Sequence, residues 1–466
     1  MTQSAAPQSV GVIGRILKNI GLLFGGKTSA VLIGLAVLAI AARALTIEEL
    51  GMLLLLHAFI ALMTGIATFK SWQALIQFGA KPVETGDMPR FHRLLRFSIG
   101  LDITAACSAA VLSVTVFLMF QDMLGLPEDV FWYALSYCLL SATNLRSSPL
   151  GILRLYDRFD LISLHDQTVP IVRLVGASLG LFLGGGLTWF ILVWMAAAAA
   201  TNLIMPALAL RELSRRGALP GLFSSRPTLK APQTGIWRYV WMSNIDATID
   251  LVDKQMPTLL AGALLGPAFA AQFKIARDVS DVFGKSARLL NQVLFPELVR
   301  LMIAGKTVRA IRIISFSSLY LLTAGIGLAV LMSLFGPALF EIALDSDYAR
   351  VASVATMLVI AAALTGGATP IYSGLYALGN PGRAALSRAI TVAITITLFV
   401  TLSSSIREAG PGWAMVIGSG LGLLITAVIA LMRAHGAGDI AGQLAFKNLT
   451  KDETNASLAD PPAKSG

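Results

Sequence analysis

Twelve apolar stretches run through this chain of 466 residues, and the lysines and arginines between them fall almost entirely on alternate loops. Most of these stretches have the roughly 20 residues that a helix needs to cross a hydrocarbon core about 30 Å thick. Hydrophobic residues make up 56% of the chain and charged residues only 13%, unlike a soluble domain. We therefore predict an all-α polytopic membrane protein, with helices at about 28–45, 48–69, 94–120, 130–150, 162–183, 187–210, 236–263, 268–297, 308–335, 352–377, 383–404 and 411–433.

The distribution of basic residues predicts the orientation in the membrane. If both termini are cytoplasmic, the inside segments and their flanking helix ends hold 27 lysines and arginines, and the outside loops hold only Arg43, Arg350 and Arg407. Short loops rich in lysine and arginine stay on the cytoplasmic side. The net charge of +10 is then explained by topology, and no nucleic-acid partner is expected.

The longest predicted cytoplasmic connection, 211–235, divides the helices six and six. It contains three prolines together with glycines and serines. We predict an N-terminal six-helix lobe at 1–210, this linker, and a C-terminal six-helix lobe at 236–435, with a central cavity between the lobes. The polar segment 446–466 is expected to be a disordered cytoplasmic tail, because it has few residues that could be buried.

No residues typical of metal or catalytic chemistry stand out. The metalloprotease pattern HExxH and the pattern CxxC are absent from the sequence. The two cysteines, Cys107 and Cys138, lie in predicted helices, which favours small buried apolar residues over a disulfide or a metal site. We expect no metal, no cofactor and no catalytic residue.

The helices predicted at 236–263 and 268–297 carry most of the intramembrane charge. Their five acids and five cations are Asp246, Asp250, Asp253, Lys254, Lys274, Arg277, Asp278, Asp281, Lys285 and Arg288. A charge at bilayer depth costs at least about 2.5–3.5 kcal/mol, so these side chains should face one another or a hydrated cavity. Two interpretations remain open, a self-neutralising ion-pair network between the two helices and the lining of a cavity.

We treat two sets of intramembrane charges as candidate functional residues. The acids of the hairpin are candidates for coupling or ion pairing; Asp250, near mid-membrane, is the candidate for proton coupling, although Lys254 at i+4 can pair with it. Arg173 in the helix 162–183 has no acid at i±3 or i±4, which suggests that it faces a cavity. The candidate substrate-binding cations are Arg277, Arg173, Lys254, Lys274, Lys285 and Arg288.

Four short segments, taken in order, resemble one transporter family. They are Ala42-Arg-Ala-Leu with Gly51, Gly151-Ile-Leu-Arg-Leu-Tyr-Asp-Arg-Phe, Leu264-Leu-Gly-Pro-Ala, and Leu294-Phe-Pro-Glu-Leu. In a twelve-helix frame they resemble the Wzx-type oligosaccharide flippases of the multidrug/oligosaccharidyl-lipid/polysaccharide (MOP) superfamily. The sequence departs from that family's pattern at Glu48-Glu49, where Gly-Pro is usual, and at Ala270, where glycine is common.

The resemblance implies a flippase, not an enzyme. It would move polyprenyl-diphosphate-linked oligosaccharide units across a bacterial inner membrane by alternating access, for the synthesis of lipopolysaccharide or another surface polysaccharide. The implied partners are the bilayer, the lipid-linked glycan and other polysaccharide-assembly membrane proteins.

Two alternatives stay open. One is a multidrug antiporter of the same superfamily, whose cavity should favour acids because its usual cargo is cationic. The other is a membrane glycosyltransferase, polymerase or ligase. Such enzymes usually carry a long periplasmic loop, whereas the longest outside loop predicted here has only about 16 residues.

Overall fold

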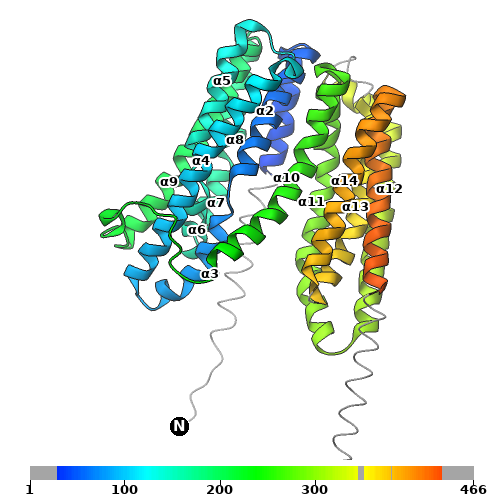
Figure 1. Cartoon of the computed structure of the whole chain (residues 1–466). Helices are drawn as coiled ribbons and strands as arrows, with labels where there is room; N and C mark the ends of the chain where they lie inside the picture. Colours follow the sequence, from blue (N-terminus) through cyan, green and yellow to red (C-terminus); the bar gives the residue numbers. More distant parts are fainter. Residues whose placement is uncertain (1–28, 345–350, 379, 433–466) are drawn as a thin grey trace, which may run out of the picture. The chain divides into compact units, whose positions relative to one another are not determined.

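The computed structural model describes residues 29–344, 351–378 and 380–432, and within these ranges every regular element is a helix (Figure 1). The predicted all-α fold is confirmed. The main helices are Ser29–Ala44, α2 (Ile47–Ala67), α3 (Ser71–Glu84), α4 (Met88–Leu124), α5 (Phe131–Leu140), α6 (Ser147–Leu155), α7 (Phe159–Asp166), α8 (Thr168–Leu183), α9 (Leu187–Arg215), α10 (Ile236–Leu265), α11 (Pro267–Ile303), α12 (Thr307–Ala343), α13 (Val351–Ala377), α14 (Pro381–Ile406) and 410–432. The predicted tail at 446–466 lies outside the described residues.

Within the described ranges, six helical segments are long and apolar enough to cross a membrane. They are Ile47–Ala67, Met88–Asp122, Leu187–Arg215, Thr307–Ile342, Val351–Ala377 and Gly382–Met432, the last of which contains two helices. The helices α10 and α11 have 30 and 37 residues, which is ample length, but they carry the intramembrane charges. The chain is therefore a multi-pass membrane protein, as the apolar stretches predicted.

Two of the predicted helices are broken in the structure. The helix expected at 130–150 is α5 and α6, separated by a short 3-10 turn, and the helix expected at 162–183 is α7 and α8. The first break follows hydroxyl groups that bond to the preceding turn, because Ser141 Oγ donates to the Cys138 carbonyl at 2.6 Å. A proline occupies the first turn of both α6 and α8, where its missing N–H costs least.

The connection expected between the second and third predicted helices is also largely helical. It contains α3, and α4 begins at Met88, six residues before the predicted start. The side chain of Asp87 accepts a hydrogen bond from the Arg90 N–H at 3.0 Å and so caps α4 at its start. The apolar pattern predicts no helix between 69 and 94, but α3 forms there because it is amphipathic and packs on α4 and α6.

The described chain divides into two compact units. The first contains the residues up to Val282 together with Leu328–Val359 and Ile396–Met415, and the second contains Phe283–Gly327, Ile360–Thr395 and the residues from Val416. The division into lobes at 211–235 stays a prediction.

Close helix contacts in the first unit centre on α2, which is buried along most of its length. A Cβ on Gly51 would lie 1.9 Å from the Pro267 carbonyl oxygen, and one on Gly262 would lie 2.4 Å from Leu55 Cδ2. At the other end of α2, Gly65 packs against Leu251 in the same way. Small residues at such crossings let membrane helices approach closely. As a result α10 lies against α2 and brings its charges near the residues described below.

The second unit contains two adjacent glycines in the middle of α13. Gly366 and Gly367 lie within α13, which continues through Pro370 as a single helix. A Cβ on Gly367 would lie 2.7 Å from Leu322 Cγ, so this glycine permits close packing against α12.

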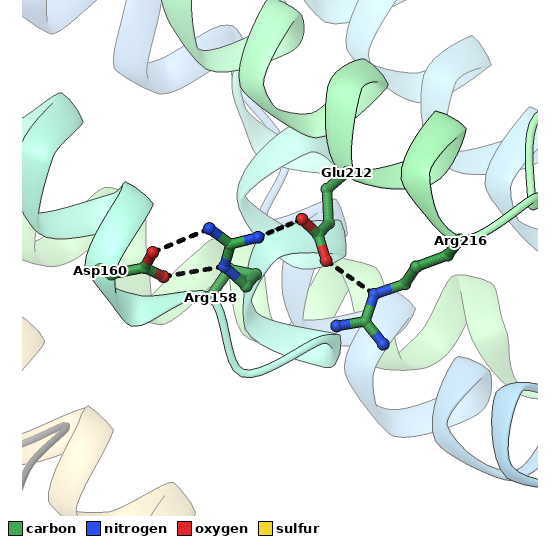
Figure 2. A network of polar contacts seen from close by, with 4 residues as sticks. All are labelled: Arg158, Asp160, Glu212 and Arg216. Atoms are coloured by element: carbon green, nitrogen blue, oxygen red, sulfur yellow. Dashed lines mark hydrogen bonds and ion pairs between the residues drawn. The ribbon is translucent and has the colours of Figure 1, made fainter.

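A polar network joins the turn between α6 and α7 to the last turn of α9 (Figure 2). Arg158 donates to both carboxylate oxygens of Asp160, at 2.8 and 2.9 Å, and also bonds to Glu212. Arg216 donates from Nε to Glu212 at 2.7 Å and stacks over the Tyr156 ring at 4.4 Å. The hydrogen bonds from Arg158 hold the pKa of the Asp160 carboxyl below its ordinary value. Glu212 is the centre of the network, because its carboxylate bonds to both arginines and its side chain is only 4% exposed.

Replacing Glu212 with glutamine should lower the free energy of unfolding by about 1–3 kcal/mol, because two arginines lose their charged acceptor. The loss should be smaller than for a fully buried pair, since the Arg158 and Arg216 side chains are 24% and 45% exposed and can be rehydrated. Thermal melting of the detergent-purified protein measures the effect. The control is Glu297→Gln, which removes an exposed pair with Arg300 and should cost about 0–1 kcal/mol. If the Glu212 and Glu297 variants melt at the same temperature, Glu212 is not the centre of a stabilising network.

Candidate functional site

A cavity of about 700 Å³ lies within the first unit, among α2, α3, α5, α6, α7, α8 and α9. Its wall contains the basic residues Lys70, Arg146, Arg154 and Arg173, two histidines, and one carboxylate, Asp166. Among the described residues, none of the four basic side chains forms an ion pair. The cavity therefore carries an excess of positive charge.

Two of these basic residues sit at helix breaks. Lys70 and Arg146 occupy the N-cap positions of α3 and α6. Arg146 donates from Nε to Asn144 Oδ1 at 2.7 Å, and Asn144 in turn donates to Thr68 Oγ1 at 3.3 Å. The break between α5 and α6 thus places a cationic residue at the cavity wall.

Arg154 lies in α6, three residues after Gly151. A Cβ on Gly151 would lie 3.0 Å from the Trp72 Cα, so glycine allows α6 to lie directly on α3. The Arg154 guanidinium then stacks over the Trp72 ring, 4.0 Å from its centroid. Its Nε is buried and, within the described part of the chain, has no hydrogen-bond partner.

Arg173 reaches the cavity from α8 and contacts only neutral groups in the described residues. Its guanidinium lies 4.5 Å from the centroid of the Trp194 ring, and Nη2 lies 3.3 Å from His57 Nε2. His57 Nδ1 is hydrogen-bonded to the Tyr137 hydroxyl at 2.9 Å. Like Arg154, Arg173 has a buried Nε that lacks a hydrogen-bond partner among these residues. The structure thus places Arg173 in a cavity wall, while its binding role stays a prediction.

Comparison with known proteins gives one relative with substantial sequence similarity. No protein-family profile matches the chain. The chain is 30% identical over 295 residues to the inner membrane protein YghQ of Escherichia coli (strain K12), covering 62% of this chain and 82% of that protein. It belongs to the YghQ family.

Solved structures show the fold that this YghQ-family chain adopts. An inward-facing multidrug resistance MATE family transporter of the MOP superfamily matches with a TM-score of 0.69 at 14% identity, over 88% of this chain and 96% of that one. The lipid II flippase MurJ, in an inward closed conformation, matches with a TM-score of 0.61 at 13% identity, over 87% and 86%. A MOP superfamily transporter from Pyrococcus furiosus, described as having a binding pocket of reverse polarity, matches with 0.59 at 14%, over 90% and 95%. These similarities establish the MOP-type fold, and the Wzx-type assignment stays a prediction.

The charged hairpin of the YghQ-family chain partly neutralises itself. Lys254 pairs with Asp250, and Lys274 pairs with Asp278, each one helical turn apart. Arg277 is 8% exposed and donates from Nη2 to the Asp253 carbonyl at 2.8 Å, while its Nη1 is buried with no hydrogen-bond partner among the described residues.

Four candidate residues of the hairpin remain, one on α10 and three on α11. Asp281 is half-buried and Lys285 exposed on α11, and the side chains of Asp246 and Arg288 lie outside the described ones.

The hairpin nevertheless lies beside the cavity. Lys274 is within electrostatic range of His57, and Asp278 is within range of Arg173. Lys70 likewise interacts with the charges of Asp250 and Lys254. The ion pairs of the hairpin and the charged cavity wall are therefore close in space.

Sequence reasoning missed three of the four cavity cations. Lys70, Arg146 and Arg154 were counted with the basic residues that flank the predicted helices on the inside, because they follow or precede apolar stretches. A usable signal was present around Arg146, which lies after Ser141 and Thr143 and shortly before Ser147-Ser148-Pro149. Such a pattern indicates a helix end inside an apolar stretch.

One further sequence match needs its structural context. The segment 21–28, GLLFGGKT, fits the letters of the nucleotide phosphate-loop pattern GxxxxGK[ST]. That pattern has meaning where it follows a β-strand and opens a helix. The segment lies outside the described residues, and we assign it no nucleotide-binding role.

Proposed function

We propose that this chain is a flippase that moves a polyprenyl-diphosphate-linked oligosaccharide from the cytoplasmic to the outer leaflet of a bacterial inner membrane. In this proposal both termini are cytoplasmic, and transport proceeds by alternating access for surface polysaccharide synthesis. The observation that carries it is the cavity with four basic side chains and one carboxylate. The family's inner-membrane relative and the MOP-type fold support it.

The cavity chemistry suits a diphosphate. Diphosphate and sugar groups cannot cross hydrocarbon unaided, because their polar atoms would lose water without replacement. Arginine is the side chain best suited to phosphate oxygens, since its planar guanidinium donates two parallel hydrogen bonds. The buried Nε atoms of Arg154 and Arg173 would gain acceptors from such a ligand.

The rest of the wall suits a sugar. It is lined by neutral donors and acceptors, among them Asn144, Thr201 and Asn202, with Trp72 as an aromatic face. These groups can bond to sugar hydroxyls without adding charge. A volume of about 700 Å³ is within the ordinary range for pockets that hold organic ligands. The lipid tail would remain in the bilayer.

A multidrug antiporter is the second candidate, supported by the fold of the MATE transporters. Its usual cationic cargo would meet four basic side chains and only Asp166 to balance them. Repulsion between like charges in a poorly hydrated cavity disfavours that cargo.

The test compares two probes on the purified full-length protein. We expect polyprenyl diphosphate to bind and inorganic pyrophosphate to compete with it, while a lipophilic cation does not bind. In a deletion strain, lipid-linked oligosaccharide should accumulate on the cytoplasmic side of the membrane. Transport of the lipophilic cation, unaffected by polyprenyl diphosphate, would overturn the proposal in favour of the antiporter.

A further inference from the structure

A buried carboxylate behind the cavity joins two helix ends. Asp102, in the middle of α4, is only 4% exposed. Its Oδ1 accepts a hydrogen bond from Ser71 Oγ at 2.7 Å, and its Oδ2 accepts one from the Ser148 N–H at 2.7 Å. Ser71 is the first residue of α3, and Ser148 is the second residue of α6. One carboxylate therefore accepts hydrogen bonds from the first turns of both helices.

Both helices lack a cap of their own. The N-cap residue of α3 is Lys70 and that of α6 is Arg146, and neither side chain makes a capping hydrogen bond. Lysine and arginine carry only donors, so they cannot satisfy the free N–H groups at a helix start. A carboxylate is the preferred partner there, because it accepts hydrogen bonds and its charge complements the helix dipole.

The same two N-cap residues line the cavity. An ordinary cap would place serine, threonine, aspartate or asparagine at these positions. Asp102 supplies the missing acceptor for the Ser148 N–H of α6 and holds the first residue of α3 through the Ser71 hydroxyl, which leaves the N-cap positions free to carry basic side chains. A bond from the Trp72 N–H to Ser147 Oγ, at 3.2 Å, also ties the two helix starts together.

We propose that Asp102 is a positioning residue, which from a third helix caps α6 and bonds to the Ser71 hydroxyl at the start of α3, and thereby holds Lys70 and Arg146 at the anion-binding wall of the cavity. The proposal rests on the proposed function, because it assigns these two cations to the diphosphate. Asp102 itself touches no substrate in this proposal.

The test measures the affinity of the purified full-length protein for polyprenyl diphosphate. In Asp102→Asn the amide oxygen can still accept from the Ser148 N–H and the N–H₂ group can donate to the Ser71 hydroxyl, so what is lost is the negative charge that strengthens both bonds. We expect the Kd to rise about ten-fold, because the two helix starts are then held only by neutral hydrogen bonds. The matched control is Asp87→Asn, which makes the same loss of charge at the cap of α4, outside the cavity, and should leave Kd unchanged.

A double-mutant cycle separates positioning from general structural support. In a Lys70→Ala/Arg146→Ala background, Asp102→Asn should raise Kd no further, because the residues through which it acts are gone. If Asp102→Asn does not accumulate, Asp102→Glu, which keeps the charge, is measured instead and should give a smaller rise in Kd.

The possible results have distinct meanings. Wild-type Kd in the Asp102 variants, or an equal rise with and without Lys70 and Arg146, would overturn the positioning role alone. Failure of the wild-type protein to bind polyprenyl diphosphate would overturn the proposed function and this inference together.

Discussion

Replacing Arg173 with alanine should lower transport of the lipid-linked substrate by about 10- to 100-fold, the range expected for loss of a hydrogen-bonded charge. The protein should still accumulate in the membrane. Among the described residues Arg173 contacts the neutral groups of His57, Tyr137 and Trp194, so its removal leaves no carboxylate without a partner. Transport in inverted vesicles, normalised to protein in the membrane, measures the effect.

Lysine at the same position is the informative control. Arg173→Lys keeps the positive charge but loses the planar pair of donors, so transport should fall between the wild-type and alanine values. If the alanine variant transports at the wild-type rate with normal accumulation, Arg173 does not belong to the binding site.

The matching substitution Arg277→Ala decides between the two interpretations of the charged hairpin. We expect lower transport with normal accumulation, as for Arg173. Absence of the variant from the membrane would instead make Arg277 a structural residue that holds α11 against the Asp253 carbonyl of α10.

Gly51→Ala should have the largest effect on stability, with a loss of about 3 kcal/mol, the upper part of the range for overpacking. The added Cβ would lie 1.9 Å from the Pro267 carbonyl oxygen and 2.4 Å from the Pro267 carbonyl carbon. These are backbone atoms, so no side chain can rotate away, and the start of α11 must move off α2. A lower Tm and reduced accumulation in the membrane are the expected results.

Gly34→Ala is the matched control for Gly51→Ala. Gly34 is also a helical glycine, but a Cβ at this position meets no atom within 4 Å. Alanine there should be neutral or stabilise the helix by up to about 1 kcal/mol. If the Gly51 and Gly34 variants melt alike, α2 and α11 do not approach as closely as described.

Local properties of the sequence were sufficient for much of the fold. The apolar length of α2, α9 and α13 predicted each helix to within a few residues, apart from the end of α9, which extends to Arg215. The breaks within 130–150 and 162–183 were missed because hydropathy is averaged over a window, whereas a helix ends where individual hydroxyl and proline residues compete for backbone bonds.

The candidate site was only partly accessible from the sequence. Arg173 was found because a cation without a nearby acid on its own helix is unusual at bilayer depth. Asp102 gave no comparable signal, since the donors it serves, Ser71 and Ser148, are 31 and 46 residues away along the chain.

By itself, the sequence determined that this chain is an all-helical membrane protein, because the cost of burying polar groups in lipid depends on the residues of each segment alone. It also determined which helices carry charge. Only the tertiary structure decided that Lys70, Arg146, Arg154 and Arg173 surround one cavity. Their meeting depends on two helix breaks, on the close packing that Gly151 allows between α3 and α6, and on a cap supplied from α4. Such contacts between distant segments are properties of the packed helices, and no single segment contains them.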